Sequence, residues 1–258
     1  MISLFRRKPK ASAVKKRPTR SNGETVALAI EGEPVSVKLR LNPRARRVIV
    51  KVHPSTGEVT VVAPTRAGLA HALDFARGEQ DWIARQRARV PQPVVLAPGA
   101  RLPFRGQSHE IRHGGRNGPA PVCHDAAGRV LWVHGRAEHA QRRLTDFFKR
   151  EARNLCEAQA LAYGAQLGVV PARITMRDTA SRWGSCSAAR AISFSWRLIF
   201  APDFVRDYVV AHEVAHLKEM NHGPRFWKLV EKLQPDFKPA QEWLRLHGRS
   251  LQRYAPKL

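Results

Sequence analysis

One stretch of the sequence combines histidine and glutamate at a spacing that suits a metal site. It reads His212-Glu213-Val214-Ala215-His216, followed by Asn221-His222. Two histidines four residues apart on a helix lie on the same face, close enough to bind one ion. The carboxylate of Glu213, next to the first histidine, can reach a metal-bound water. Because zinc prefers imidazole ligands and leaves a fourth position open for water, the pattern predicts a catalytic Zn²⁺ centre.

A third ligand is expected six residues after His216, where His222 stands. This is the spacing of the H-E-x-x-H-x-x-G-x-x-H pattern, except that Glu219 occupies the place of the glycine. We expect the chain to turn at Asn221, since asparagine tolerates the left-handed conformation that ends helices. Gly223-Pro224 then prevents the helix from continuing.

Other interpretations of these residues stay open. The two helical histidines could be satisfied by hydrogen bonds in the core, with Glu213 on a solvated face. His222 could be a helix-cap residue, in which case an acid on the next helix, Glu231 or Asp236, would be the third ligand. The apolar residues around the motif favour a buried helix, and buried neighbouring histidines need partners such as a metal ion.

The charge of the chain is strongly positive. The formal net charge is +24, and subtracting the eight basic residues of the acid-free first twenty residues leaves +16 on the remainder. Such a surface favours anionic partners, namely nucleic acid, nucleotides or acidic proteins. The alternative is that the charge serves solubility alone.

Cysteine usage and hydropathy indicate a cytoplasmic protein. The three cysteines, Cys123, Cys156 and Cys186, are scattered and odd in number, so no disulfide framework is predicted. No apolar run reaches the roughly 18 residues of a membrane span, so no membrane is expected as a partner. The first five residues are too short for a secretory signal.

The N-terminal half is expected to be rich in β-strands. We predict a disordered basic tail over residues 1–22 and a β-rich region with one helix over residues 23–135. Alternating apolar residues predict an antiparallel meander of four strands, at 26–30, 35–41, 48–53 and 59–63. A helix follows at about 66–89, with Gly78 as its weak point and Trp82 in the core.

Four more short strands are expected at 102–104, 108–112, 121–124 and 130–134. Their histidines lack ligand spacing and are interpreted as surface residues; they are His109, His113, His124 and His134. The long helix that follows, at about 138–167, should bury a stripe of apolar residues that includes Leu161.

Residues 136–258 are predicted to form a separate domain around the metal helix. The expected order is a strand at 173–177, a loop at 181–187 and a strand at 191–200. The metal helix follows from Pro202, a position suited to proline, and two further helices complete the domain. An edge strand beside the metal helix would let an extended peptide add on as another strand.

Several of these motifs together resemble the YgjP-like family of metal-dependent hydrolases, which is related to SprT-like and minigluzincin metallopeptidases. The resemblance is carried by Arg182-Trp183-Gly184-Ser185-Cys186-Ser187, Leu198-Ile199, Pro202, Tyr208 to Leu217, Asn221-His222 and Phe226-Trp227. It implies an α+β fold, in which an N-terminal antiparallel β-rich region precedes a zincin-like metallopeptidase domain. It also implies zinc on His212, His216 and His222, with Glu213 as the catalytic acid/base.

The main hypothesis is therefore a zinc-dependent hydrolase, most simply a metallopeptidase acting on a peptide or protein substrate. Zinc would activate a water, and Glu213 would accept its proton as general base. A hydrogen-bond donor to the transition state is also needed. The candidates for this donor are Arg182, Ser185, Tyr208 and Asn221.

Trp183 and Cys186 could line the site, or the Trp183 loop could pack against the metal helix and hold it in place. Cys186 could also be a fourth ligand that closes the site.

Two rival functions follow from the same residues. Members of the family are described both as peptidases and as UTP pyrophosphatases, so a metal-dependent nucleoside triphosphate pyrophosphatase is one alternative. Against it, the chain lacks a G-x-x-x-x-G-K-[ST] loop. The second alternative is a nucleic-acid-binding protein with a structural metal site, which fits the basic tail and a basic face at Arg44, Arg46, Arg47 and Lys51. A structural metal site does not need a carboxylate beside a metal-bound water, so the presence of Glu213 argues against this second alternative.

Overall fold

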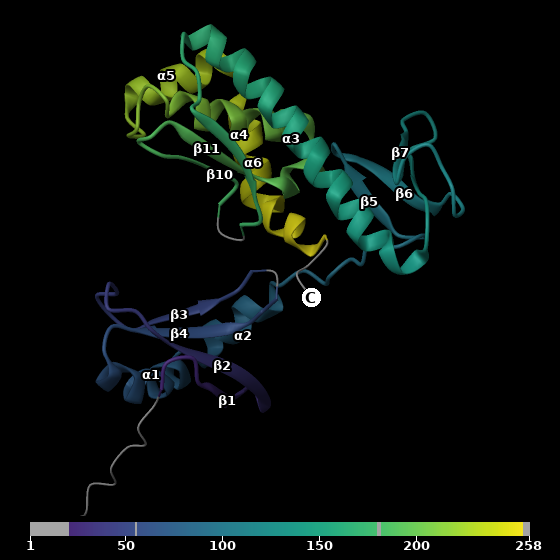
Figure 1. Cartoon of the computed structure of the whole chain (residues 1–258). Helices are drawn as coiled ribbons and strands as arrows, with labels where there is room; N and C mark the ends of the chain where they lie inside the picture. The colour runs from purple at the N-terminus through teal and green to yellow at the C-terminus, as the bar shows by residue number, and fades with distance from the viewer. Residues whose placement is uncertain (1–20, 55, 180–181, 255–258) are drawn as a thin grey trace, which may run out of the picture. The chain divides into compact units, whose positions relative to one another are not determined.

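The computed structural model describes residues 21–54, 56–179 and 182–254 (Figure 1). The tail predicted over residues 1–22 lies outside these ranges except for its last two residues. The chain forms two compact units. The first runs to Val52 and resumes over Glu58–Gln86, and the second comprises His53–Gly57 and Arg87–Leu258. The boundary predicted between residues 135 and 136 falls inside the second unit.

The first unit contains a four-stranded sheet in which the two most buried strands are central. Its strands are β1 (Thr25–Ile30), β2 (Glu33–Leu41), β3 (Ile49–Val52) and β4 (Val59–Ala63), in the order β1-β2-β4-β3. The predicted antiparallel meander is wrong in one pairing, because β2 and β4 are parallel. Val37 and Leu39 of β2 and Val59 and Val61 of β4 are fully buried. Pairing these two strands places the most apolar residues at the centre and leaves β1 and β3 at the edges.

Two helices complete the first unit, α1 (Arg66–Gly78) and α2 (Gln80–Ala88). The Thr65 hydroxyl accepts a hydrogen bond from the backbone N–H of Gly68 at 3.0 Å and caps α1. The predicted single helix breaks at its glycine, as expected from the low helix propensity of Gly78. Phe75 departs from the predicted apolar stripe with 43% of its surface exposed. Trp82 is half-buried and packs against the core of this unit.

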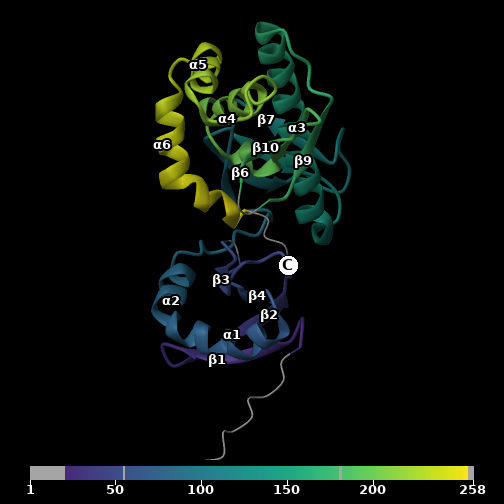
Figure 2. The same ribbon diagram turned by 90° about the vertical axis from the view of Figure 1, so that its left-hand side faces the viewer.

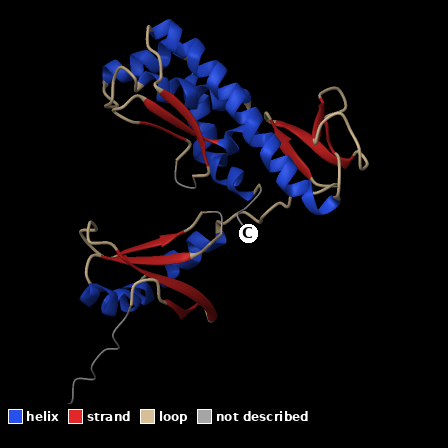
Figure 3. Ribbon diagram, viewed as in Figure 1, coloured by secondary structure: helices blue, strands red, loops and turns tan. Residues whose placement is uncertain are grey.

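The second unit begins with a sheet of the same topology as the first. Its strands, which Figure 3 draws in red, are β5 (Arg101–Phe104), β6 (Gln107–His113), β7 (Val122–Asp125) and β8 (Val130–Val133). Their order in the sheet is β5-β6-β8-β7. Again the central pair, β6 and β8, is parallel. The first hairpin of each sheet has a two-residue turn whose second residue is glycine. These turns are Glu31-Gly32 and Arg105-Gly106, and φ is positive at both residues of each turn. Such turns match the twist of paired strands.

The interpretation of the four histidines here as surface residues is wrong for His109, which is 3% exposed. Its Nε2 lies 3.0 Å from Nε2 of His124, and its ring packs edge-on against Phe104. His109 lies on the inward side of β6, where a polar ring is tolerated because the neighbouring imidazole and the carbonyl of Gln107 satisfy both nitrogens.

A long helix, α3 (Ala140–Leu167), connects the second sheet to the rest of the unit (Figure 1). It follows the short 3-10 helix η1 (Ala137–His139) and ends at Gly168, which is in the left-handed conformation expected of a C-terminal glycine. Leu161 is 55% exposed, contrary to the prediction. It lies about 100° around the helix from the buried Ala160, outside the stripe that faces the core.

The third sheet carries strands β9 (Arg173–Arg177), β10 (Gly184–Cys186) and β11 (Ala191–Ser195), in the order β10-β11-β9. The loop predicted at 181–187 therefore contains a strand. The strand predicted at 191–200 stops at Ser195 and continues as the 3-10 helix η2 (Trp196–Phe200). All five η2 side chains are buried, which an alternating strand with one solvated face would not allow.

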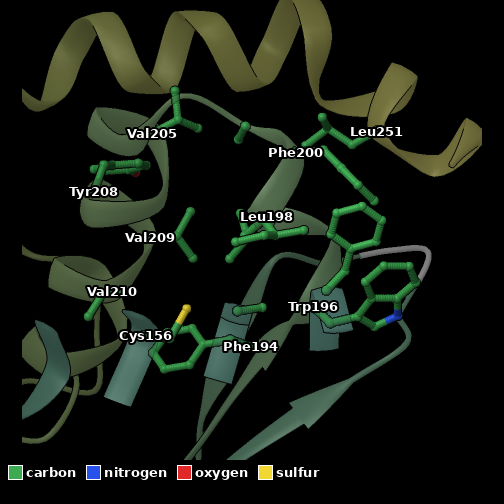
Figure 4. Close-up of a cluster of buried hydrophobic side chains, with 14 of the residues drawn as sticks. Cys156, Phe194, Trp196, Leu198, Phe200, Val205, Tyr208, Val209, Val210 and Leu251 are labelled. Carbon is green, nitrogen blue, oxygen red and sulfur yellow. The ribbon is translucent and has the colours of Figure 1, made fainter. Parts of the chain in front are cut away.

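The helices α4 (Asp203–Ala215), α5 (Pro224–Leu233) and α6 (Phe237–His247), with the 3-10 helix η3 (Gly248–Arg253), confirm the predicted C-terminal helices. α4 lies between α3 and α6 (Figure 2). Side chains from α3, β11, η2 and α4 meet in the core, among them Cys156, Phe194, Leu198 and Val209 (Figure 4). Among the described residues, no helix combines the length and apolarity needed to cross a membrane.

Candidate metal centre

Burial of α4 on several sides places the motif inside the second unit. The helix begins after Pro202, and Asp203 in its first turn interacts favourably with the helix dipole. The residues Val205, Val209, Val210, Ala211 and Val214 are buried against neighbouring elements. The imidazole of His212 and the carboxylate of Glu213 are thereby held in fixed positions by packing.

The structure brings together the three histidines singled out in the sequence. One nitrogen from each of His212, His216 and His222 lies within 4.8 Å of the others. The Nε2 atoms of His212 and His222 are 3.1 Å apart. Two nitrogens bound to one tetrahedral zinc at 2.0–2.1 Å would be separated by about 3.3 Å. The spacing therefore fits a shared ion.

The tautomer of His216 also fits a metal ligand. Its Nδ1 lies 3.0 Å from the backbone carbonyl oxygen of Glu219, so Nδ1–H donates and Nε2 keeps its lone pair. A hydrogen bond of this kind orients the ring of a ligating histidine and fixes its tautomer. Glu219, which replaces the glycine of the motif, thus orients the ring of His216 through its backbone carbonyl.

The turn that carries His222 back to α4 differs from the expectation. Asn221 is not in the left-handed conformation. Instead α4 ends at Ala215, and tight backbone hydrogen bonds follow, from Leu217 to Val214 and from Lys218 to Ala215, both at 3.0 Å. The turn needs no positive φ because these short-range bonds already satisfy the carbonyls at the helix end.

Phe226 on α5 is part of the site and was not assigned a role from the sequence. Its fully buried ring contacts all three imidazoles, with centroid distances of 4.8 Å to His212, 4.5 Å to His216 and 4.7 Å to His222. An apolar wall of this kind orients the ligands and limits solvent access. Its position two residues after Pro224, at the start of a strongly amphipathic helix, was the available sequence signal.

The other candidate ligands do not join this cluster. Within the described ranges, Glu231, Asp236 and Cys186 contribute no atom to the group of ligand atoms around His212. The thiol of Cys186 lies near Glu213 instead, and its pKa is raised by burial and by that carboxylate.

Burial keeps the imidazoles of His212 and His216 neutral. It lowers the pKa of His212 to about 4, with smaller contributions from His216 and His222, and it also lowers the pKa of His216. Neutral imidazoles have the free lone pairs that metal binding requires, so these ligands do not have to lose a proton at neutral pH.

Glu213 is buried against β10, with 5% of its surface exposed. Burial raises the pKa of its carboxyl to about 8, and the positive charge of Arg182 opposes this shift. A Cβ atom at Gly184 would lie 2.4 Å from Oε1 of Glu213. The close approach of carboxylate and strand therefore requires glycine at this position, a role that the sequence analysis did not give to Gly184.

Strand β10 forms one edge of the third sheet and contacts α4. The hydroxyl of Ser185 is hydrogen bonded across the sheet to Ser193 at 2.8 Å. The hydroxyl of Tyr208 accepts a hydrogen bond from Gln241 at 3.0 Å and lies 3.5 Å from Nδ1 of His212. Trp183, just before β10, packs against the main core. Ser185 and Tyr208 thus already have partners within the protein.

Three convergent imidazoles, two from α4 and its C-terminal cap and one from the following turn, beside a buried carboxylate define a metallohydrolase type of site. The family model of the YgjP-like metallopeptidase domain matches residues 46–247. The chain belongs to this family, and its class is that of the metal-dependent peptidases.

Comparison with solved structures finds the metallopeptidase zymogen abylysin of Pyrococcus abyssi, 24% identical, covering 38% of this chain and 97% of that one. The TM-score of 0.33 is too low for this likeness to support any argument. No match was found among the curated proteins.

Proposed function

We propose that this chain is a zinc-dependent metallopeptidase in which His212, His216 and His222 hold the ion and Glu213 is the general base. The observation that carries the proposal is the convergence of three imidazoles beside a buried carboxylate. Zinc suits three nitrogen ligands and keeps a fourth position for water or substrate.

When bound, zinc would polarise the scissile carbonyl and lower the pKa of water from about 15.7 towards 7. A nearby cation stabilises the charged form of a carboxyl, so Glu213 would be ionised in the loaded enzyme despite its burial. Its carboxylate would accept the proton of the attacking water and pass it to the leaving amine. Gly184 keeps this carboxylate in place by leaving room for it against β10.

The free edge of β10 is the surface that would bind the substrate. An extended peptide adds to such an edge through backbone hydrogen bonds, which align it without demanding a particular sequence. Of the four candidates for stabilising the transition state, Arg182 is the one whose charge already acts on Glu213. The hydroxyl of Tyr208 accepts its hydrogen bond from Gln241, so its O–H stays available to donate to a developing oxyanion.

The test compares wild type with His216→Ala and Glu213→Gln, purified without chelators under reducing conditions. Metal content is measured by mass spectrometry, and hydrolysis of an unfolded polypeptide and of UTP is assayed in parallel. We expect about one zinc per chain in wild type and Glu213→Gln, its loss in His216→Ala, and polypeptide cleavage by wild type alone. A metal chelator should abolish cleavage, and added zinc should restore it.

Cleavage by Glu213→Gln would refute the role of Glu213. A wild-type protein without zinc would refute the metal centre, and turnover of UTP alone would replace the peptidase with a pyrophosphatase.

A further inference from the structure

A second candidate site lies at the other edge of the third sheet, away from the histidines. A cavity of about 350 Å³ opens between α3 and the end of β9. Its lining is mostly cationic and consists of Lys149, Arg150, Arg153, Met176, Arg177, Asp178 and Trp196. Sheet order separates it from β10, because β9 and β10 are the opposite edges.

Two of the four lining cations are not neutralised. Arg150 lies 3.8 Å from Glu151, and Arg153 lies 2.9 Å from Glu157. Lys149 and Arg177 have no ion pair within the part of the chain that the structure describes. The cavity therefore presents positive charge from both of its walls, α3 and β9.

The lining acid does not cancel this charge. Asp178 is bound in an ion pair to the guanidinium of Arg197, which is buried and stacks on Trp196 with its Cζ 4.5 Å from the ring centroid. The Asp178 carboxylate is thus already paired with Arg197. An anion entering the cavity would meet the excess positive charge of Lys149 and Arg177.

Trp196 gives the cavity an aromatic wall. Trp196 is 1% exposed, and its indole Nε1 is buried without a hydrogen-bond partner in the described structure. In Figure 4 this nitrogen lies on the side of the ring turned away from Phe194 and Phe200. The nitrogen is closed off from solvent, so Trp196 contributes its ring rather than its N–H, and the ammonium of Lys149 lies over that ring with Nζ 5.9 Å from the centroid.

We propose that this cavity binds the phosphate group of a small molecule, with Lys149 and Arg177 as its donors. Two cations on two walls suit a doubly charged phosphate better than a singly charged carboxylate, and guanidinium groups bind phosphate in a bidentate manner. The volume is at the small end of the range for ligand pockets and leaves room beside the phosphate for an organic group against Met176. This site is independent of the proposed peptidase centre.

The test is calorimetric titration of the full-length protein at low salt with inorganic phosphate, phenyl phosphate and benzoate. We expect saturable binding of one phenyl phosphate per chain, weaker binding of inorganic phosphate, and none of benzoate. Lys149→Gln/Arg177→Gln should weaken phosphate binding by at least about tenfold, as expected for lost charged hydrogen bonds.

A matched control, Lys38→Gln/Lys51→Gln, removes the same charge from exposed positions of the first unit and should leave binding unchanged.

Equal weakening by both double variants would show a general charge effect and overturn the site. Binding of benzoate as tight as that of phenyl phosphate would overturn the assignment of phosphate. Saturable binding of a single-stranded oligonucleotide without any binding of phenyl phosphate would also overturn the small-molecule site.

Discussion

The substitution Gly184→Ala tests whether the position of the Glu213 carboxylate is set by strand β10. The added Cβ would lie 2.4 Å from Oε1, 2.5 Å from Cγ and 2.7 Å from Cδ of Glu213. Restoring an ordinary contact of about 3.5 Å requires a displacement of roughly 1 Å. Because Glu213 is buried, the carboxylate has to move within the site, and a misplacement of 1 Å can cost about 100-fold in rate.

We therefore expect Gly184→Ala to lower kcat for cleavage of an unfolded polypeptide by about 100-fold at unchanged zinc content. Zinc should stay because the three atoms nearest to the added Cβ all belong to Glu213 and none to a histidine. The assay pairs initial cleavage rates with metal analysis of the same preparation.

The matched control is Gly223→Ala, next to His222. Nothing lies within 4 Å of a Cβ at this position, and its φ of −82° suits alanine. This variant should keep near wild-type activity. Full activity of Gly184→Ala would refute the reasoning, and so would a loss of activity that is explained by loss of zinc.

Three further predictions concern the surroundings of the site. Burial raises the pKa of the Cys156 thiol to about 12 from an ordinary value of 9.0, so at pH 9 the thiol should resist alkylation in the native protein and react only after unfolding. Peptide mapping of the alkylated protein checks this, and labelling of the native thiol at pH 9 would contradict its burial. The raised pKa also contributes stability below pH 9 that is lost as the pH rises towards 12. Leu198→Ala should lower the free energy of unfolding by about 2–5 kcal/mol in denaturant titrations, whereas Leu246→Ala, at a side chain that is 57% exposed, should change it by less than about 0.5 kcal/mol; similar effects of the two would contradict the assigned core. Tyr208→Phe should weaken zinc binding by about tenfold in a chelator competition because the hydroxyl lies 3.5 Å from Nδ1 of His212, and unchanged affinity would show that the phenol does not support this ligand.

Local patterns in the sequence predicted most of the secondary structure. Alternating apolar residues located the strands of the two four-stranded sheets, and helical periodicity located α1, α3, α4, α5 and α6. The spacing of His212, His216 and His222 was enough to group them, because two are one helical turn apart and the third follows a short turn.

Long-range pairing was not readable from the same patterns. The parallel partners β2 and β4 are separated along the chain by β3, and only the burial of both strands together explains their contact. The switch from β11 to η2 likewise depends on five side chains that must all be buried at once. His109 was misjudged because its partner His124 is brought to it by the pairing of β6, β8 and β7.

The sequence by itself determined the chemistry available to this protein, since the residue types and the helical spacing of the H-E-x-x-H motif are local properties. The tertiary structure decided which groups surround that chemistry. Phe226 closes one side of the histidine cluster, and Gly184 allows Glu213 to lie against β10. The first contact joins consecutive elements, and the second joins segments that are distant along the chain. They arise from packing of α5 and β10 against α4, which depends on the shape of the whole core and is not encoded in any single stretch of residues.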